Sequence, residues 1–240
     1  MPAPDKADTT RPLHKAEIAA FEALAEVRLA ERDLFSAQAQ KAGNDAMISA
    51  INLRTKQREE AAEQANNSNN FVYVFDKQVD DNTVKSCITK LTEWSRLNPE
   101  CEIEVQINSP GGSIFAGLAL VDFIRSLQDK GHTVNTVALG VAASMGGVIL
   151  QVGTTRIMGK NCILLLHQGS LGAIGDFAQV EDRVRLMSLF HERILDIFEE
   201  RSKPINPKTT KAFIKRNWDR KDWWMTADDA LKLGFVDEVR

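Results

Sequence analysis

The sequence predicts an α/β fold with a mainly parallel sheet, preceded by an α-helical N-terminal extension. Two observations support this fold class. From residue 71 onward, short runs rich in Val, Ile and Leu alternate with longer amphipathic segments, an order typical of parallel strands covered by helices. Before residue 65 the chain is dense in Ala, Glu, Lys, Arg and Gln, with no proline after Pro12, and this composition favours helix.

The N-terminal part divides into two segments. Residues 1–12 are rich in proline and charge, and we expect a flexible N-terminus there. Residues 13–65 are the predicted helical extension, in which apolar or small residues recur every seven positions and again three positions later, as in a coiled coil: Leu13, Ala20, Val27, Leu34, and Ala16, Ala23, Ala30, Ala37. An alanine-rich helix also produces such matches by chance, and Lys41 interrupts them. Gly43-Asn44-Asp45 resembles a helix stop and a new N-cap, so we expect either a helical hairpin or a coiled coil.

The polar run at 66–70 has strong turn preference, and we place a linker there, before a domain at 71–240. Alternating and apolar runs predict strands in this domain at 71–75, 103–107, 133–139, 155–158 and 163–166. Helical periodicity and capping residues predict helices at 80–97, 114–127, 141–152, 177–201 and 208–216, and from Thr226 onward.

The composition is that of a globular protein, and it excludes several partner classes. The 240 residues are 43% hydrophobic, and 30 basic and 33 acidic residues, mixed along the chain, give a formal charge of -3. This mixture offers no basic surface for nucleic acid or anionic lipid. Neither a run of about 18 apolar residues nor a secretion signal is visible, so we expect a cytoplasmic protein that does not bind membranes. Cys87, Cys101 and Cys162 lack metal-ligand spacing and are expected to be reduced structural thiols.

Three fragments in the second half of the chain together supply what acyl transfer needs. Ser144, in Ala-Ala-Ser-Met-Gly, is a hydroxyl nucleophile between small residues, near the predicted start of a helix that favours developing negative charge. His167 follows a predicted strand and is a candidate general base, since parallel sheets place functional groups at strand ends. The glycines in the Asn-Ser-Pro-Gly-Gly turn at 108–112 offer exposed backbone N–H groups.

Each fragment alone has a simpler interpretation. A small serine serves close helix packing, Ser-Pro-Gly-Gly is a common strand-to-helix turn, and a histidine at a strand end is often structural. The remaining histidines, His14, His132 and His191, lie in the helical extension, a turn and a long helix, and we assign them to the surface or to structure. The order and context of the three fragments favour the catalytic interpretation.

The chain from about Phe71 to Arg240 resembles a ClpP-family serine peptidase. The resemblance rests on Ile-Asn-Ser-Pro-Gly-Gly at 107–112, Ala-Ala-Ser-Met-Gly at 142–146, the strand ending in His167-Gln168, and a pattern from Asp222 to Ala230 followed by Gly-Phe-Val-Asp at 234–237. It implies a ClpP/crotonase-like spiral of βαβ units. It also implies a serine endopeptidase that cleaves peptide bonds through an acyl-enzyme.

The resemblance implies a role for each matching residue. Ser144 would be the nucleophile, His167 the general base, and Asp222 the acid that orients the imidazole. The backbone N–H groups of Gly112 and Met145 would form the oxyanion hole.

Further residues are expected around this triad. The glycine-rich segment 169–176 matches the family's strand-loop beside the substrate, and the expected substrate-binding residues are Gly111, Gly169, Ser170 and Leu171. Asp219, Asp228 and Asp229 compete with Asp222 for the acid role, although the last two also suit the start of a helix. No cofactor or metal is expected, apart from ATP used by a separate unfoldase.

The resemblance also implies a homo-oligomer of stacked rings around a proteolytic chamber, which binds polypeptide substrates as an added strand. Family members that dock a ring-shaped ATPase unfoldase carry aromatic residues on the strand before the glycine turn. Here Glu104 and Gln106 stand at those positions, and Tyr73 is the only tyrosine. We therefore hypothesise that this protein does not use the usual unfoldase, or uses it differently.

The helical extension leaves several settings open. It fits a phage or prophage capsid-maturation protease that partners a capsid or scaffold protein, a setting that the altered positions Glu104 and Gln106 favour slightly. It also fits the proteolytic subunit of a cellular ATP-dependent Clp protease. Outside proteolysis, the alternatives are a non-catalytic scaffold or assembly protein with this fold, and a crotonase-type acyl-CoA enzyme. The complete serine, histidine and aspartate set disfavours both of these.

Overall fold

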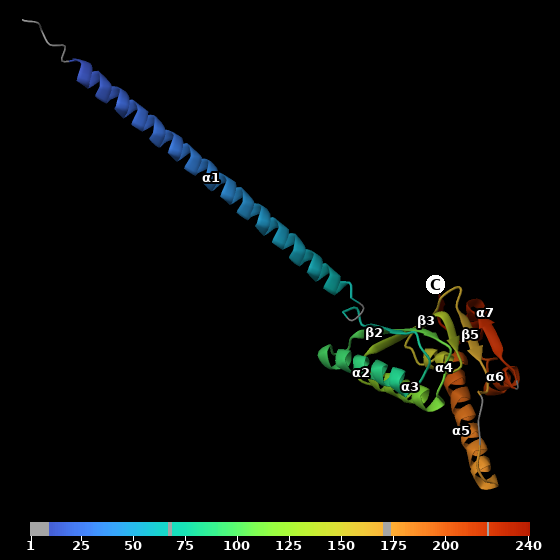
Figure 1. The fold of residues 1–240 in the computed structure, drawn as a ribbon. Helices are drawn as coiled ribbons and strands as arrows, with labels where there is room; N and C mark the ends of the chain where they lie inside the picture. The colour runs from blue at the N-terminus through green and yellow to red at the C-terminus, as the bar shows by residue number, and fades with distance from the viewer. Residues whose placement is uncertain (1–9, 67–68, 170–173, 220) are drawn as a thin grey trace, which may run out of the picture. The chain divides into compact units, whose positions relative to one another are not determined.

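The chain divides into two compact units, Met1–Gln64 and Ala65–Arg240. The computed structural model describes residues 10–66, 69–169, 174–219 and 221–240. Over its described residues the first unit is one continuous helix of 55 residues, α1 (Thr10–Gln64) (Figure 1). Its side chains from residue 15 to residue 63 are exposed.

Helix α1 runs through Gly43 without a break, so the predicted helix stop at 43–45, and with it the helical hairpin, is wrong. A glycine inside a helix costs about 1 kcal/mol relative to alanine, which is too little to end a helix flanked by strong helix formers. Asp45 begins no new helix, because it lies inside the continuous helix Thr10–Gln64. The coiled-coil seam stays a prediction.

The second unit is built on a mainly parallel sheet, which confirms the predicted fold class. Its strands are β1 (Val72–Phe75), β2 (Glu102–Ser109), β3 (Thr133–Ala143), β4 (Arg156–Met158), β5 (Ile163–Leu166), β6 (Trp223–Thr226) and β7 (Glu238–Val239). The main path runs β1-β2-β3-β4-β7, while β5 pairs with β3 and β6 pairs with β5. Only the β5–β6 pair is antiparallel among these strands.

Helices cover the sheet and close the core. They are α2 (Asp81–Leu97), α3 (Ile114–Gln128), α4 (Met145–Leu150), α5 (Phe177–Ser202), α6 (Lys211–Trp218) and α7 (Ala227–Leu233). Helices α2 and α3 contact each other and lie along the same side of the sheet in Figure 1. Alternate β2 residues, Ile103, Val105 and Ile107, are fully buried beneath this layer. The burial of alternate residues is what a strand of period two requires.

Strand β3 is longer than predicted, because Val141–Ala143 belong to it and not to the following helix. Gly140 has φ 76°, a conformation in which glycine is unstrained, and the chain bends there. Asn108 Oδ1 accepts a hydrogen bond from the Val141 N–H at 3.2 Å. Before the bend β3 pairs with β4, and after it with β5. Ser144 therefore stands at the end of a strand, directly before α4.

Arg156 on β4 carries a fully buried charge that fastens the C-terminal segment to the sheet. Its guanidinium donates to the two carboxylate oxygens of Asp237 at 2.6 and 3.0 Å, and to the Gly234 carbonyl at 2.9 Å. Burial of the Asp237 carboxyl opposes its ionisation, but the hydrogen bonds and charge of Arg156 outweigh burial. The pKa of Asp237 therefore lies below its ordinary value.

Replacing Asp237 with asparagine should lower the free energy of unfolding at pH 7 by about 3 kcal/mol, because the Arg156 charge stays buried without its counter-ion. The pKa of Asp237 is depressed by folding, so this contribution is present at neutral pH and is lost as the pH falls below about 4. Urea unfolding should show a smaller difference between wild type and Asp237→Asn at pH 3 than at pH 7.

The matched control is Glu238→Gln, which removes only an exposed ion pair with Arg240. It should cost less than about 0.5 kcal/mol. An equal loss for Asp237→Asn at both pH values would contradict the ion-pair explanation.

Candidate active site

Ser144 lies at the sharp turn between β3 and α4. Its backbone has φ 52° and ψ -120°, a combination that non-glycine residues rarely adopt. A hydrogen bond to the sheet stabilises this conformation: the Ser144 N–H donates to the Leu165 carbonyl on β5 at 2.9 Å. Strain of this kind persists where surrounding structure enforces it, and it is common at functional sites.

His167 and Asp222 are brought together by the antiparallel pairing of β5 with β6. The last paired residues are Leu166 and Trp223. The residues just outside the ladder on the two segments, His167 and Asp222, therefore face each other. His167 Nδ1 lies 3.8 Å from Asp222 Oδ1, with the side chains 29% and 58% exposed. This distance is longer than a hydrogen bond, as is common in catalytic groups without substrate.

The glycine turn lies directly against Ser144. A Cβ atom built on Gly111, which has φ 90°, would stand 2.6 Å from both Ser144 Cβ and the Ala143 carbonyl oxygen, so only glycine fits without a shift. Ser109 Oγ supports the turn by accepting from the Gly111 N–H at 3.2 Å and donating to the Lys77 carbonyl at 2.6 Å.

Two backbone N–H groups are placed to act as donors beside Ser144. Gly112 forms a parallel bridge with Val79, in which the Gly111 carbonyl and the Ser113 N–H make the two hydrogen bonds. Because carbonyl and N–H groups alternate in direction along a strand, the Gly112 N–H faces away from Val79. The Met145 N–H belongs to the first residue of α4, and N–H groups in the first turn of a helix have no partner within the helix.

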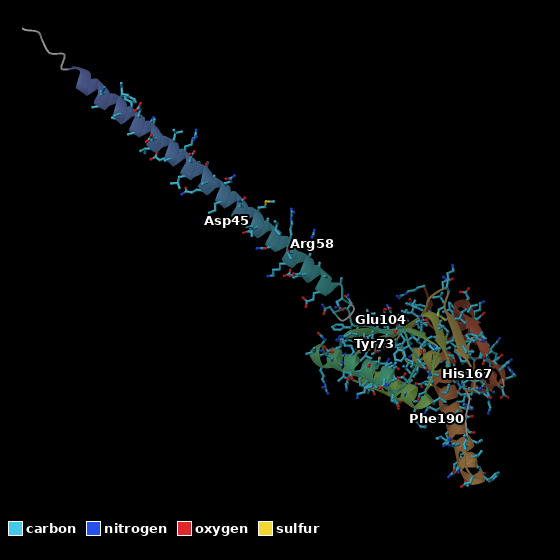
Figure 2. All side chains as sticks on the ribbon, in the orientation of Figure 1. Asp45, Arg58, Tyr73, Glu104, His167 and Phe190 are labelled. Carbon is cyan, nitrogen blue, oxygen red and sulfur yellow. The ribbon has the colours of Figure 1, made fainter. Side chains whose placement is uncertain are left out.

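These groups line one pocket of about 680 Å³. Ser144, His167, Gly111, Gly112 and Met145 contribute to its wall. A second part of the lining, the apolar wall, comes from α3, α5 and the end of α6: Phe115, Met187, Phe190, Ile194, Phe198 and Trp218. The Phe115 and Phe190 rings meet edge to face with centroids 4.9 Å apart, and Figure 2 shows Phe190 and His167 close together in the region where α5 meets the sheet.

Of the other predicted substrate-binding residues, Gly169 also lines this pocket, whereas Ser170 and Leu171 lie outside the described residues. The three competing acids occupy other places. Asp219 accepts a hydrogen bond from Gln168 Nε2 at 2.8 Å. Asp229 forms the capping box of α7 with Thr226, and Asp228 lies in the first turn of that helix. Only Asp222 among them contacts His167.

Sequence reasoning missed the apolar wall and the hydrogen-bond partner of one histidine. The wall residues on α5 share a face with the core, so their periodicity reads as ordinary packing. His191, predicted to lie at the surface or to be structural, is structural: it is part-buried, and its Nε2 donates a hydrogen bond to the carbonyl oxygen of Gln168, the residue after His167. A histidine within an amphipathic helix carries no local signal of such a contact.

Comparison with known proteins gives concordant results. A family model described as Clp protease matches residues 54–240. The chain is 31% identical over 163 residues to an ATP-dependent Clp protease proteolytic subunit of Deinococcus radiodurans, covering 67% of this chain and 76% of the relative. It is 34% identical to proteolytic subunit 3 of Streptomyces coelicolor, covering 70% and 74%, and 35% identical to proteolytic subunit 2 of Tropheryma whipplei, covering 68% and 86%.

None of the helices in the described parts of the chain combines the length and the apolar character that a membrane span needs.

Proposed function

The chain belongs to the Clp protease family and is a serine-type peptidase, and from this premise we propose that Ser144, His167 and Asp222 carry out peptide-bond hydrolysis. The observation that carries this assignment is the convergence of the strained Ser144 turn, the His167–Asp222 pair and the glycine turn. Ser144, His167 and the glycine turn all line one pocket. The proposed reaction uses water and no cofactor.

In the proposed mechanism, His167 Nε2 takes the proton of Ser144 Oγ as Oγ attacks the scissile carbonyl carbon. Asp222 holds the proton on Nδ1, so that Nε2 is the free base, and stabilises the imidazolium that forms. The approach of Nδ1 and Oδ1 from 3.8 Å to hydrogen-bond distance completes the pair. The Gly112 and Met145 N–H groups bind the negative oxygen, each worth about 10²- to 10³-fold in rate.

The tetrahedral intermediate collapses when its C–N bond breaks. His167 gives the proton to the departing amine, which leaves an ester between Ser144 and the acyl half of the substrate. Water then attacks this ester with His167 again as base, and the acid product leaves with Ser144 Oγ reprotonated. The apolar wall beside Ser144 suits a large apolar side chain at the residue that supplies the scissile carbonyl.

A fluorophosphonate probe should label the native protein at Ser144, and the same preparation should hydrolyse a fluorogenic peptide with an apolar residue before the scissile bond. Peptide mapping by mass spectrometry identifies the labelled serine. Ser113→Ala is the matched control, because Ser113 lines the same pocket but caps α3 through the Ala116 N–H. Its labelling should be unchanged, at a stability cost of about 1 kcal/mol.

Absence of both labelling and hydrolysis in a folded, assembled preparation would favour the alternative of a non-catalytic scaffold with this fold. Labelling at a serine other than Ser144 would contradict the proposed nucleophile.

We also propose that the protein acts as a homo-oligomer whose rings enclose the active sites. Support comes from exposed apolar side chains on α5, where Phe177 is 84%, Val184 52% and Leu189 62% exposed. Apolar side chains exposed in this number on one helix are typical of a contact surface. Mass measurement of the native protein by light scattering tests this proposal, and a monomeric mass at micromolar concentration would contradict it.

Docking of an unfoldase is proposed to differ from that of aromatic-rich family members. Gln106 Nε2 donates to Glu104 Oε1 at 2.7 Å, so two neighbouring outward positions of β2 form a polar pair. Tyr73 lies on the adjacent strand β1 (Figure 2). A polar pair is a poor receptor for an apolar docking loop. Saturable stimulation of protein degradation by a purified Clp unfoldase with ATP would overturn this proposal.

A further inference from the structure

Gln168, the residue that follows His167, is held from two sides. Its carbonyl oxygen accepts a hydrogen bond from His191 Nε2 on α5. Its side-chain Nε2 donates to Asp219 Oδ1 at 2.8 Å, at the C-terminal end of α6. The His191 ring also meets the Trp218 ring edge to face, with centroids 5.9 Å apart. His191 therefore contacts both Gln168 and the residue directly before Asp219.

The contacts of Gln168 and His191 lie just beyond the end of the β5–β6 ladder. The β5–β6 ladder ends at Leu166 and Trp223, so neither His167 nor Asp222 belongs to a strand. Beyond them, the next link that the described residues make between the two segments is the Gln168–Asp219 hydrogen bond. The His167–Asp222 pair is thus bracketed by the ladder on one side and by this bond on the other. Bracketing limits how far the two side chains can separate.

We propose that Gln168, His191 and Asp219 form a latch that positions His167 against Asp222. The proposal rests on the catalytic roles given above and adds three positioning residues to them. Phe190 and Ile194 on the same helix line the pocket, whereas His191 does not, so it acts on the reaction through Gln168 and not by touching substrate.

The chemistry of His191 suits this role. A backbone carbonyl is only an acceptor, so the Nε2 atom facing Gln168 must carry a hydrogen. Trp218, against which the ring packs, is 2% exposed, and a buried side chain of this size limits the movement of the imidazole. A hydrogen-bond donor supported by a buried aromatic ring holds a backbone carbonyl with little freedom, and small displacements of a catalytic group cost rate steeply.

Two substitutions at position 191 separate the hydrogen bond from simple packing. His191→Phe keeps a ring against Trp218 but has no donor, and it should lower kcat for a fluorogenic peptide roughly 10-fold with KM little changed. His191→Gln places an amide N–H near the position of Nε2 and should recover most of the lost kcat. The rate of fluorophosphonate labelling, which depends on His167 but not on peptide binding, should fall and recover in parallel.

A double-mutant cycle tests the second arm of the latch. Gln168→Met removes the side-chain donor at similar length, and Asp219→Ala removes the acceptor. Each single variant should lower kcat several-fold, and the double variant should be no slower than the slower single variant, because both remove the same bond. Thermal unfolding of each variant shows whether the fold is intact.

Two results would overturn the latch. One is an unchanged kcat in His191→Phe, and the other is strict additivity in the Gln168–Asp219 cycle. Equal losses in the Phe and Gln variants at position 191 would also contradict it, since they would assign the effect to packing. Failure of the proposed function looks different, because the wild type would then show neither hydrolysis nor labelling at Ser144.

Discussion

Replacing Ser144 with alanine should lower kcat/KM for a fluorogenic peptide by roughly 10⁵-fold or more, since the attacking oxygen is lost and only transition-state binding by the pocket remains. His167→Ala should be nearly as slow. Because the two residues act as a unit, the Ser144→Ala/His167→Ala double variant should be no slower than Ser144→Ala alone. A further large loss in the double variant would mean that His167 acts on another step.

The same position offers a stability test that is independent of activity. Ser144 has φ 52°, which alanine tolerates as poorly as serine but glycine adopts freely. Ser144→Gly and Ser144→Ala should both be inactive, with the glycine variant more stable by about 1 kcal/mol in chemical unfolding. If alanine were the more stable of the two, the strain at this turn would be absent in solution.

Alanine at Gly111 should lower kcat/KM by roughly 10²- to 10³-fold, although Gly111 itself supplies no reacting group. The added methyl group would stand 2.6 Å from Ser144 Cβ and from the Ala143 carbonyl oxygen, and the local φ of 90° is unfavourable for alanine. Either the glycine turn or the nucleophile must therefore move. Both the rate of peptide hydrolysis and the rate of fluorophosphonate labelling should be measured for Gly111→Ala, and both should fall.

Gly43→Ala is the matched control for this substitution. A Cβ on Gly43 meets nothing within 4 Å, and the residue lies inside α1. The change should leave peptidase activity unaltered and stabilise the helix by about 1 kcal/mol. Wild-type activity in Gly111→Ala would show that the turn lies farther from Ser144 than the structure places it.

The elements with strong local patterns were predictable from the sequence. The long amphipathic run at 177–201 became α5 with nearly the same bounds, Phe177–Ser202, and the alternating run at 103–107 lies within β2. Strands β6 and β7 were not predicted, because their pairing depends on partners far away in the chain. The end of β3 was taken for helix because its small residues carry no strand signal.

The candidate site shows the same division between local and long-range information. Motifs bring attention to Ser144, His167 and the glycine turn, and the structure places all of them on one pocket. The pattern from Asp222 to Ala230 singles out Asp222 only through the family resemblance. Its place opposite His167 comes from the β5–β6 register, which no local pattern specifies. At Gly43 the local signal was wrong. Its turn preference predicted a helix stop, but the helix formers around it outweigh this preference and α1 continues through the residue.

The late position of β6 in the chain has a consequence for biosynthesis. Leu166 pairs with Trp223 across 57 residues of sequence, so a growing polypeptide contains Ser144, His167 and the glycine turn well before its proposed acid exists. Chains are made from the N-terminus at about 5 to 20 residues per second, and earlier segments begin to fold meanwhile. We therefore expect peptidase activity to arise only after β6 has been made and has paired with β5, late in the folding of the chain.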